Sequence, residues 1–169
     1  GVPVILVPGN HERSRIPRTL TSGVPGLHIL DRPRTVTFTV RGLRLAVSGF
    51  PFERRVAGCL ADCLAATGWR EVDADVRLLC LHQAVEGATV GPADYTFRPG
   101  PDVIRGRRLP AGFAAVLSGH IHRAQLLTVD LAGRRLPAPV VYPGSVERTA
   151  FAERDEDKGF ALLELEAGG

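Results

Sequence analysis

Three apolar segments of this chain run into residues that can bind metal ions, and this arrangement restricts the possible folds more than any other feature. The segments are residues 4–7 before Asn10, residues 76–81 before His82, and residues 114–117 before His120. Short apolar runs bounded by turn residues are typical of buried strands. Ligands of α/β sheets collect outside the carboxyl ends of strands. The sequence therefore predicts an α/β fold with a polar site along one edge.

The remaining patterns predict further strands and one clear helix. Residues 35–40 and 43–47 alternate around Arg41-Gly42, as in a β-hairpin. Residues 53–67 carry apolar side chains at helical spacing and are followed by Gly68, so we expect an amphipathic helix with a glycine cap. The last third predicts a β-meander of residues 125–131, 139–142 and 159–165. Together with the run at residues 4–7, expected as a central buried strand, these elements predict a two-sheet α/β sandwich.

Length and composition indicate a single domain spanning residues 1–169. Hydrophobic residues make up 44% and charged residues 23% of the chain, an ordinary globular balance. No apolar run reaches the roughly 18 to 20 residues that cross a membrane, and three cysteines without a CxxC pair suggest free thiols in a reducing cytoplasm. The chain has no Met, so we expect its natural start to lie upstream.

Gly9-Asn10-His11-Glu12 is the first candidate for site chemistry. Asn10 offers a carbonyl oxygen that suits Mn²⁺ or Mg²⁺. Adjacent residues of an extended chain point in opposite directions, which would leave His11 free to face a substrate. Gly9 would allow a sharp turn close to the ion. By itself the segment is more typical of a simple turn, because Pro-Gly-Asn is common turn chemistry.

Gly119-His120-Ile121-His122 is the most informative segment. Histidines at i and i+2 lie on one side of an extended segment, with Ile121 directed to the core. This suits ligands of two ions ~3.5 to 4 Å apart. A pair of solvated loop histidines is the alternative, as is a single zinc site. His82 gains a role as a ligand from its position at a strand end, whereas His28 lacks such a context and is interpreted as structural.

In this order the motifs resemble the second half of the signature of the calcineurin-like metallophosphoesterase superfamily. The later residues Tyr142-Pro143-Gly144-Ser145, with Phe151-Ala152-Glu153 and Lys158-Gly159-Phe160, resemble the nuclease subunit of the bacterial SbcCD DNA-repair complex. The resemblance implies a four-layer α/β/β/α metallophosphoesterase sandwich and an exonuclease or endonuclease acting on DNA. It also implies two divalent ions, with Mn²⁺ expected, and an SbcC-type ATPase partner.

Carried onto this chain, the resemblance implies metal ligands at Asn10, His82, His120 and His122, with His11 as the proton donor to the leaving group. The family's Asp-x-His and Gly-Asp-x-x-Asp motifs should precede Gly9, and they are absent from the 169 residues. We therefore expect the chain to be the C-terminal portion of the domain and inactive alone. Arg13 and Arg15 flank the first motif, where a phosphodiester backbone could lie.

Two alternatives to a DNA nuclease remain open from the sequence. The first is a phosphatase or phosphodiesterase of a nucleotide or another small molecule, because one fold hosts many substrates. The second is a catalytically incomplete fragment that only folds or binds one ion.

Overall fold

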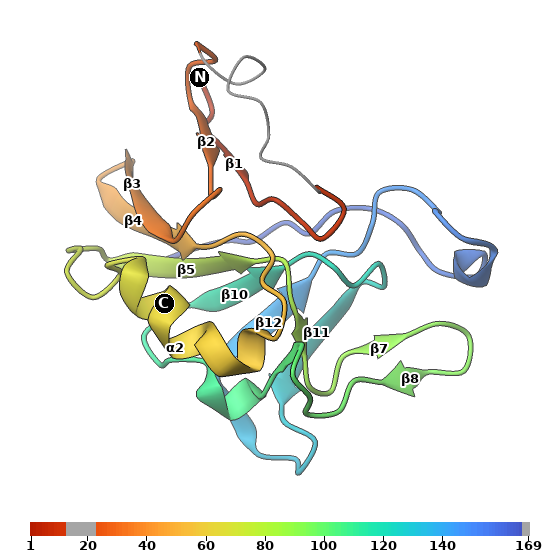
Figure 1. Ribbon diagram of the computed structural model, residues 1–169. Coiled ribbons are helices and arrows are strands. Elements are labelled where there is room, and N and C mark those ends of the chain that lie inside the picture. The colour runs from red at the N-terminus through yellow and green to blue at the C-terminus, as the bar shows by residue number, and fades with distance from the viewer. Residues whose placement is uncertain (13–22, 167–169) are drawn as a thin grey trace.

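A six-stranded sheet is the main element of the computed structural model, which describes residues 1–12 and 23–166 (Figure 1). The strand order is β11-β12-β10-β5-β4-β3. In chain order the strands are β3 (Arg34–Val40), β4 (Leu43–Gly49), β5 (Val76–Leu81), β10 (Ala115–Ser118), β11 (Gln125–Val129) and β12 (Arg135–Tyr142). The inner strands β12, β10, β5 and β4 are parallel, while β11 and β3 pair in antiparallel fashion at the two edges. The inner strands therefore all end at the same edge of the sheet.

The predicted hairpin is confirmed. β3 and β4 pair from Arg34 opposite Gly49 to Val40 opposite Leu43. Arg41 and Gly42 form the two-residue turn with φ of 52° and 84°, and positive φ at both positions gives the twist that such hairpins need. The strand expected over residues 76–81 matches β5, and the one expected over residues 114–117 corresponds to β10.

Within the described residues, three two-stranded sheets accompany the large one. They are the parallel pair β1 (Val4–Leu6) and β2 (Leu27–Ile29), the parallel pair β6 (Ala84–Val85) and β9 (Val103–Ile104), and the antiparallel pair β7 (Thr89–Val90) and β8 (Tyr95–Thr96). With the helix described below, they make the protein a mixed α/β structure with several sheets.

The expectation that residues 4–7 form a central buried strand is wrong. Among the described residues β1 pairs only with β2, and Val4 is 54% exposed. Ile5 and Val7 pack on a cluster formed by Leu30, Val47 and Cys80. An unbroken apolar run suggests burial on both faces, but only one face of this strand is covered by described residues.

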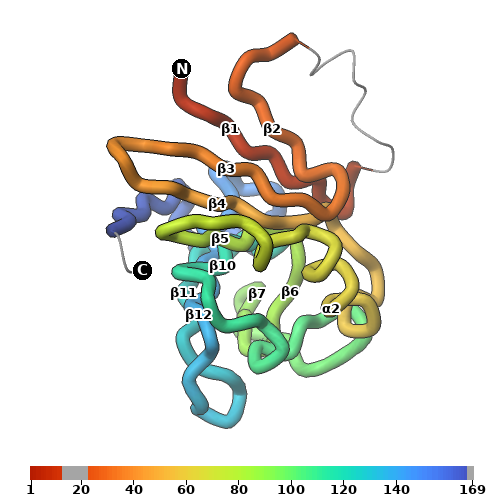
Figure 2. Tube along the Cα trace, turned by 90° about the vertical axis from the view of Figure 1, so that its left-hand side faces the viewer, coloured from red at the N-terminus to blue at the C-terminus, as the bar shows by residue number. Residues whose placement is uncertain are grey.

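The six-stranded sheet separates two apolar cores. Figure 2 shows β1 and β2 on one side of the sheet, with α2 (Val56–Ala66) and β6 on the other. The helix buries Val56, Leu60 and Leu64, as predicted. It ends at Ala66, with Thr67 as the C-cap before Gly68, which has φ of 66°. It begins three residues later than expected, because Arg55 is left-handed and its amide donates to Asp102 Oδ1 at 2.6 Å.

The third strand of the predicted meander does not form. Residues 159–165 carry no strand, and Phe160 and Leu162 are each 85% exposed. Their alternation indicated a face suited to burial, but no described strand pairs with them. Two short 3₁₀ helices complete the description, η1 (Gly106–Arg108) and η2 (Phe151–Glu153). No helix within residues 1–12 and 23–166 combines the length and apolar character needed to cross a bilayer.

Candidate metal centre

Asn10, His82 and His120 converge beyond the carboxyl ends of β1, β5 and β10. Oδ1 of Asn10 lies 3.0 Å from Nε2 of His82 and 3.3 Å from Nδ1 of His120. The centroids of the two imidazole rings are 5.4 Å apart. His82 and His120 are 72 and 110 positions from Asn10 along the chain. The tertiary fold, and not their position in the sequence, therefore brings the three residues together. Of the four residues expected as metal ligands, Asn10, His82 and His120 are brought together, whereas the His122 ring instead contacts Glu153 and Thr149.

The distances from Oδ1 of Asn10 to the two imidazole nitrogens match the spacing between ligands of one divalent ion. Bond lengths of ~2.0 to 2.2 Å place neighbouring ligand atoms roughly 3.0 to 3.5 Å apart in octahedral or tetrahedral geometry. Two imidazole nitrogens with one amide oxygen suit a borderline metal such as Mn²⁺. The site therefore fits part of the ligand shell of such an ion.

Both histidines of the cluster are held in the form that binds metal. Burial, and then the neighbouring His120, lowers the pKa of His82 to about 4. Burial also lowers the pKa of His120, with smaller effects of His122 and His11. Neutral imidazole has a free lone pair, and imidazolium does not. At neutral pH both rings are available as ligands without losing a proton.

Two glycines make room for the His82 ring. A Cβ at Gly9 would lie 2.6 Å from Cε1 of His82, and one at Gly119 would lie 2.8 Å from its Nδ1. The amide of Gly119 also donates to the Leu81 carbonyl at 3.1 Å. The sequence suggested that Gly9 serves a sharp turn. In the structure the reason for glycine is instead the close approach of an imidazole.

The His120 backbone adopts a strained conformation. Its φ is 75°, one of four positive values among the described non-glycine residues. Such conformations are uncommon for side chains with a Cβ and concentrate at functional sites. The next residue, Ile121, is 3% exposed, as its expected core direction requires. The turn thus presents His120 at the edge of the sheet while anchoring the loop in the core.

His122 faces a carboxylate rather than the Asn10 cluster. Its Nδ1 lies 2.8 Å from Oε1 of Glu153 and 3.0 Å from Oγ1 of Thr149. The hydrogen bond from Lys158, with a further one from His122, holds the pKa of Glu153 at about 2. An ionised carboxylate can only accept, so the proton of a neutral His122 belongs on Nδ1. Its Nε2 then keeps a lone pair, as in metal sites where an outer carboxylate orients the histidine.

A buried lysine holds this outer layer together. Nζ of Lys158 lies 2.9 Å from Glu153 and 3.0 Å from Glu156, and it donates to the His122 carbonyl at 3.0 Å. The side chain of Lys158 is only 7% exposed. Lys158 therefore fixes both the backbone of His122 and the carboxylate that contacts its ring.

The segment from Tyr142 to Ser145 supports the histidine loops through its backbone and one phenol. The Tyr142 hydroxyl donates to the Gln83 carbonyl at 3.0 Å and accepts the Val85 amide at 2.8 Å. The Ser145 amide donates to the His122 carbonyl at 3.1 Å. These contacts hold the residues that follow His82 and the loop that carries His122.

Sequence reasoning missed several residues that shape the site. The Phe52 ring centroid lies 6.3 Å from that of His82 and 5.7 Å from that of His120. A signal existed, because Phe52 follows strand β4, which ends at the same edge. Glu153 lies in one of the segments that carry the family resemblance and Thr149 lies outside them. Neither had an assigned role, since a helix or loop position does not reveal a partner 27 to 31 residues away.

The other predicted residues have different outcomes. His11 is exposed and directly follows Asn10 along the chain. His28 packs edge-on against Phe38 at a centroid distance of 5.2 Å. Arg13 and Arg15 lie outside the described residues.

Within the described part of the chain, no three His, Cys, Asp or Glu side chains are grouped to hold an ion. Asn10, His82 and His120 together offer three ligand-type atoms, fewer than two metal ions would require. No protein-family model matches this chain.

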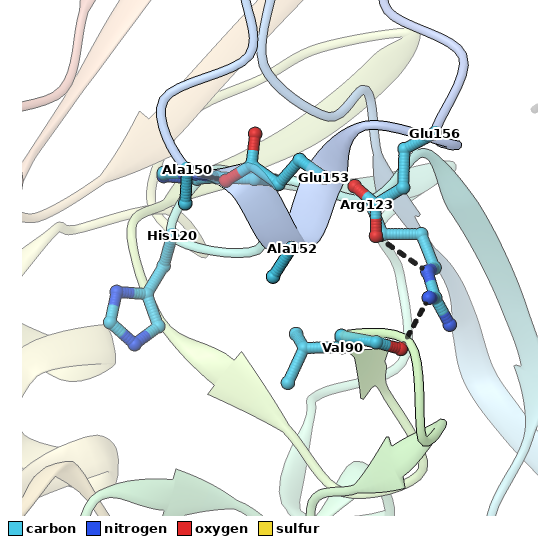
Figure 3. Close-up of a pocket in the computed structure, with 9 residues that line it drawn as sticks. Val90, His120, Arg123, Ala150, Ala152, Glu153 and Glu156 are labelled. Atoms are coloured by element: carbon cyan, nitrogen blue, oxygen red, sulfur yellow. Dashed lines mark hydrogen bonds and ion pairs between the residues drawn. The ribbon is translucent and has the colours of Figure 1, made fainter.

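A cavity of about 290 Å³ adjoins the histidines (Figure 3). His120 and His122 line it together with residues of the β7–β8 hairpin and of the η2 segment. Residues 86–101, which lie between β6 and β9, contain this hairpin. The candidate centre is therefore bordered by a recess that could hold part of a substrate.

Proposed function

We propose that this protein contributes to a divalent-metal centre that hydrolyses phosphate esters, with the phosphodiester bond of DNA as the substrate. One observation carries the proposal: Asn10, His82 and His120 converge from three strand ends, and the Asn10 oxygen lies at ligand spacing from a nitrogen of each imidazole. Metal-assisted hydrolysis is the reaction class in which such a set recurs.

Different residues of the chain would bind the metal ions and donate the proton. Asn10, His82 and His120 would hold one ion, and Nε2 of His122 would serve the second. Bound divalent ions supply an activated water at neutral pH and stabilise negative charge on the phosphate oxygens. His11, exposed beside the cluster, would donate a proton to the departing alkoxide oxygen. Phe52 would shield one side of the imidazoles from water.

The fold we propose is the two-sheet metallophosphoesterase sandwich, with the β1–β2 pair and the six-stranded sheet as parts of its two sheets. Supporting this, the two sheets share an apolar core built around Leu30, Val47 and Cys80. The resemblance to the SbcCD nuclease subunit supports DNA as the substrate and an SbcC-type ATPase as the partner. The contacts of Tyr142 and Ser145 give those motif residues a physical role beside the histidines.

A small-molecule phosphatase or phosphodiesterase is the second candidate. The cavity of about 290 Å³ beside His120 favours it, since recesses of this kind hold compact ligands. A substrate panel separates the two candidates: linear double-stranded DNA, bis(p-nitrophenyl) phosphate and p-nitrophenyl phosphate, each with Mn²⁺. Cleavage of DNA and the diester without the monoester supports the nuclease.

Metal binding tests the centre directly, whether or not the chain alone turns over substrate. Titrated Mn²⁺ should broaden the NMR signals of His82 and His120 before those of His28. The Asn10→Ala variant should need more Mn²⁺ for the same broadening. Equal broadening of all three histidines would contradict the proposed centre.

A further inference from the structure

The cavity beside the histidines has two aliphatic sides. Val90 of β7 and Ala152 of η2 face the same space from opposite sides, and His120 borders it at one end (Figure 3). Ala150 adds a further methyl group. The volume of about 290 Å³ is close to the lower end of the ~300 to 1,000 Å³ range of small-molecule sites. The space is therefore an apolar slot sized for one compact group.

Arg123 fixes the two sides of the slot relative to each other. Its guanidinium reaches the β7–β8 hairpin through Asp94 Oδ1 at 2.5 Å and the Gly91 carbonyl at 2.7 Å. The same group bonds Glu156 Oε1, beyond η2, at 3.0 Å. A planar guanidinium with several directed donors suits such a bridge. The slot is thus held open by the protein and needs no ligand to form.

The charges around the slot disfavour a second phosphate. Glu153 and Glu156 border it. The one cation among its described lining residues, Arg123, already donates from Nε and both terminal nitrogens to protein acceptors. Beyond the reach of ions held by His120 and His122, an anion placed here would meet two carboxylates and no protein cation free to pair with it. An uncharged group would instead bury apolar surface against Val90 and Ala152.

We propose that this slot is a subsite for an uncharged planar group esterified to the phosphate at the metal centre, such as the base of a nucleoside. The inference rests on the proposed function, because it places the phosphate beside His120 and His122. It adds how the substrate is selected: the slot would favour nucleotide esters over simple alkyl phosphates. The ring would lie between Val90 and Ala152.

Three probes test the slot in the presence of Mg²⁺: thymidine 5′-monophosphate, methyl phosphate and thymidine. Ala152→Leu fills the slot from one side, and Ala150→Leu provides an independent second variant. Both should weaken binding of thymidine 5′-monophosphate by at least about tenfold, the scale on which a hydrophobic pocket discriminates by size. Both should leave methyl phosphate unchanged. Ala132→Leu, in the exposed turn between β11 and β12, is the matched control and should change neither affinity.

NMR saturation transfer to thymidine, which carries no phosphate, measures binding to the slot independently of the metal centre. Transfer that disappears in Ala152→Leu and Ala150→Leu supports the slot even if no phosphate ester is hydrolysed, in which case only the proposed function fails. Equal weakening of thymidine 5′-monophosphate and methyl phosphate would overturn the slot, as would unchanged binding of thymidine and its monophosphate in both variants.

Discussion

Nδ1 of His122 and Oε1 of Glu153 lie 2.8 Å apart, although 31 positions separate the residues along the chain. The carboxylate reaches the histidine from η2, and Thr149 Oγ1 bonds to the same oxygen at 3.0 Å. This contact assigns the proton of a neutral His122 to Nδ1 and leaves Nε2 as the ring's only lone pair. It thereby selects which atom of His122 can bind a metal ion.

Replacing Glu153 with Ala should remove the preference of neutral His122 for a proton on Nδ1. We expect His122 to populate both neutral tautomers, a change that long-range ¹⁵N–¹H correlation spectra report directly. Loss of an outer partner of a ligand histidine typically lowers metal affinity by ~10- to 100-fold. The matched control is Glu156→Ala. This change also removes a partner of Lys158, but the Glu156 side chain makes no hydrogen bond to the His122 ring. An unchanged His122 tautomer in Glu153→Ala would show that the carboxylate does not orient the ring.

Gly9→Ala should displace the His82 ring, because the new Cβ would meet three of its atoms at 2.6 to 2.9 Å. Overpacking of this kind costs about 1 to 3 kcal/mol, or the ring moves and Mn²⁺ affinity falls. Gly58→Ala is the control: Gly58 lies in α2, and a Cβ added there would have nothing within 4 Å. That change should stabilise the protein by roughly 0.5 to 1 kcal/mol. Urea unfolding and Mn²⁺ titration of both variants measure the difference, and equal behaviour would contradict the steric argument.

Patterns within short stretches of the sequence predicted the elements that depend on hydrophobic periodicity or on the residues of a turn. The hairpin around Arg41-Gly42 and the helix with Val56, Leu60 and Leu64 follow from patterns within a few residues. Strand pairing is not local, so the exposed position of β1 and the absence of a strand at residues 159–165 could not be predicted from apolar content.

The same distinction holds at the candidate site. Asn10, His82 and His120 could be singled out because each follows an apolar strand, and parallel strands end at one edge. Glu153, Thr149 and Phe52 join the site through contacts between distant segments. Such a contact cannot be predicted from the type of a residue or from its neighbours in the sequence.

In metal-free buffer, the free energy of unfolding of the protein should fall as the pH is lowered from about 6.5 to about 4. Burial, and then His120, lowers the pKa of folded His82 from its ordinary 6.5 to about 4. Between these values the unfolded chain binds a proton that the folded chain does not, so acid favours unfolding. This stability is fully present above pH 6.5. His82→Gln should reduce the difference between the urea midpoints at pH 7 and pH 4.5, whereas His28→Gln should retain it. The same difference in wild type and His82→Gln would exclude His82 as its source.

The sharpest functional prediction separates His11 from His82 in an active, Mn²⁺-loaded form of the protein. His82→Ala removes a proposed ligand nitrogen, so metal affinity and rate should fall together, and excess Mn²⁺ should recover part of the rate. His11→Ala should leave metal binding nearly intact while the rate falls by ~10² to 10⁴, the usual contribution of a positioned acid.

The nature of the leaving group distinguishes proton transfer from any other role of His11. A p-nitrophenolate departs with little help from a proton, whereas the alkoxide of a nucleotide needs one. The loss of rate in His11→Ala should therefore be smaller for bis(p-nitrophenyl) phosphate than for DNA, while His82→Ala should slow both substrates alike. Mn²⁺ titrations followed by initial rates on each substrate give both quantities. If His11→Ala loses its ions, or if added Mn²⁺ restores its rate as fully as it restores His82→Ala, then His11 acts as a ligand and the assignment of proton transfer is wrong.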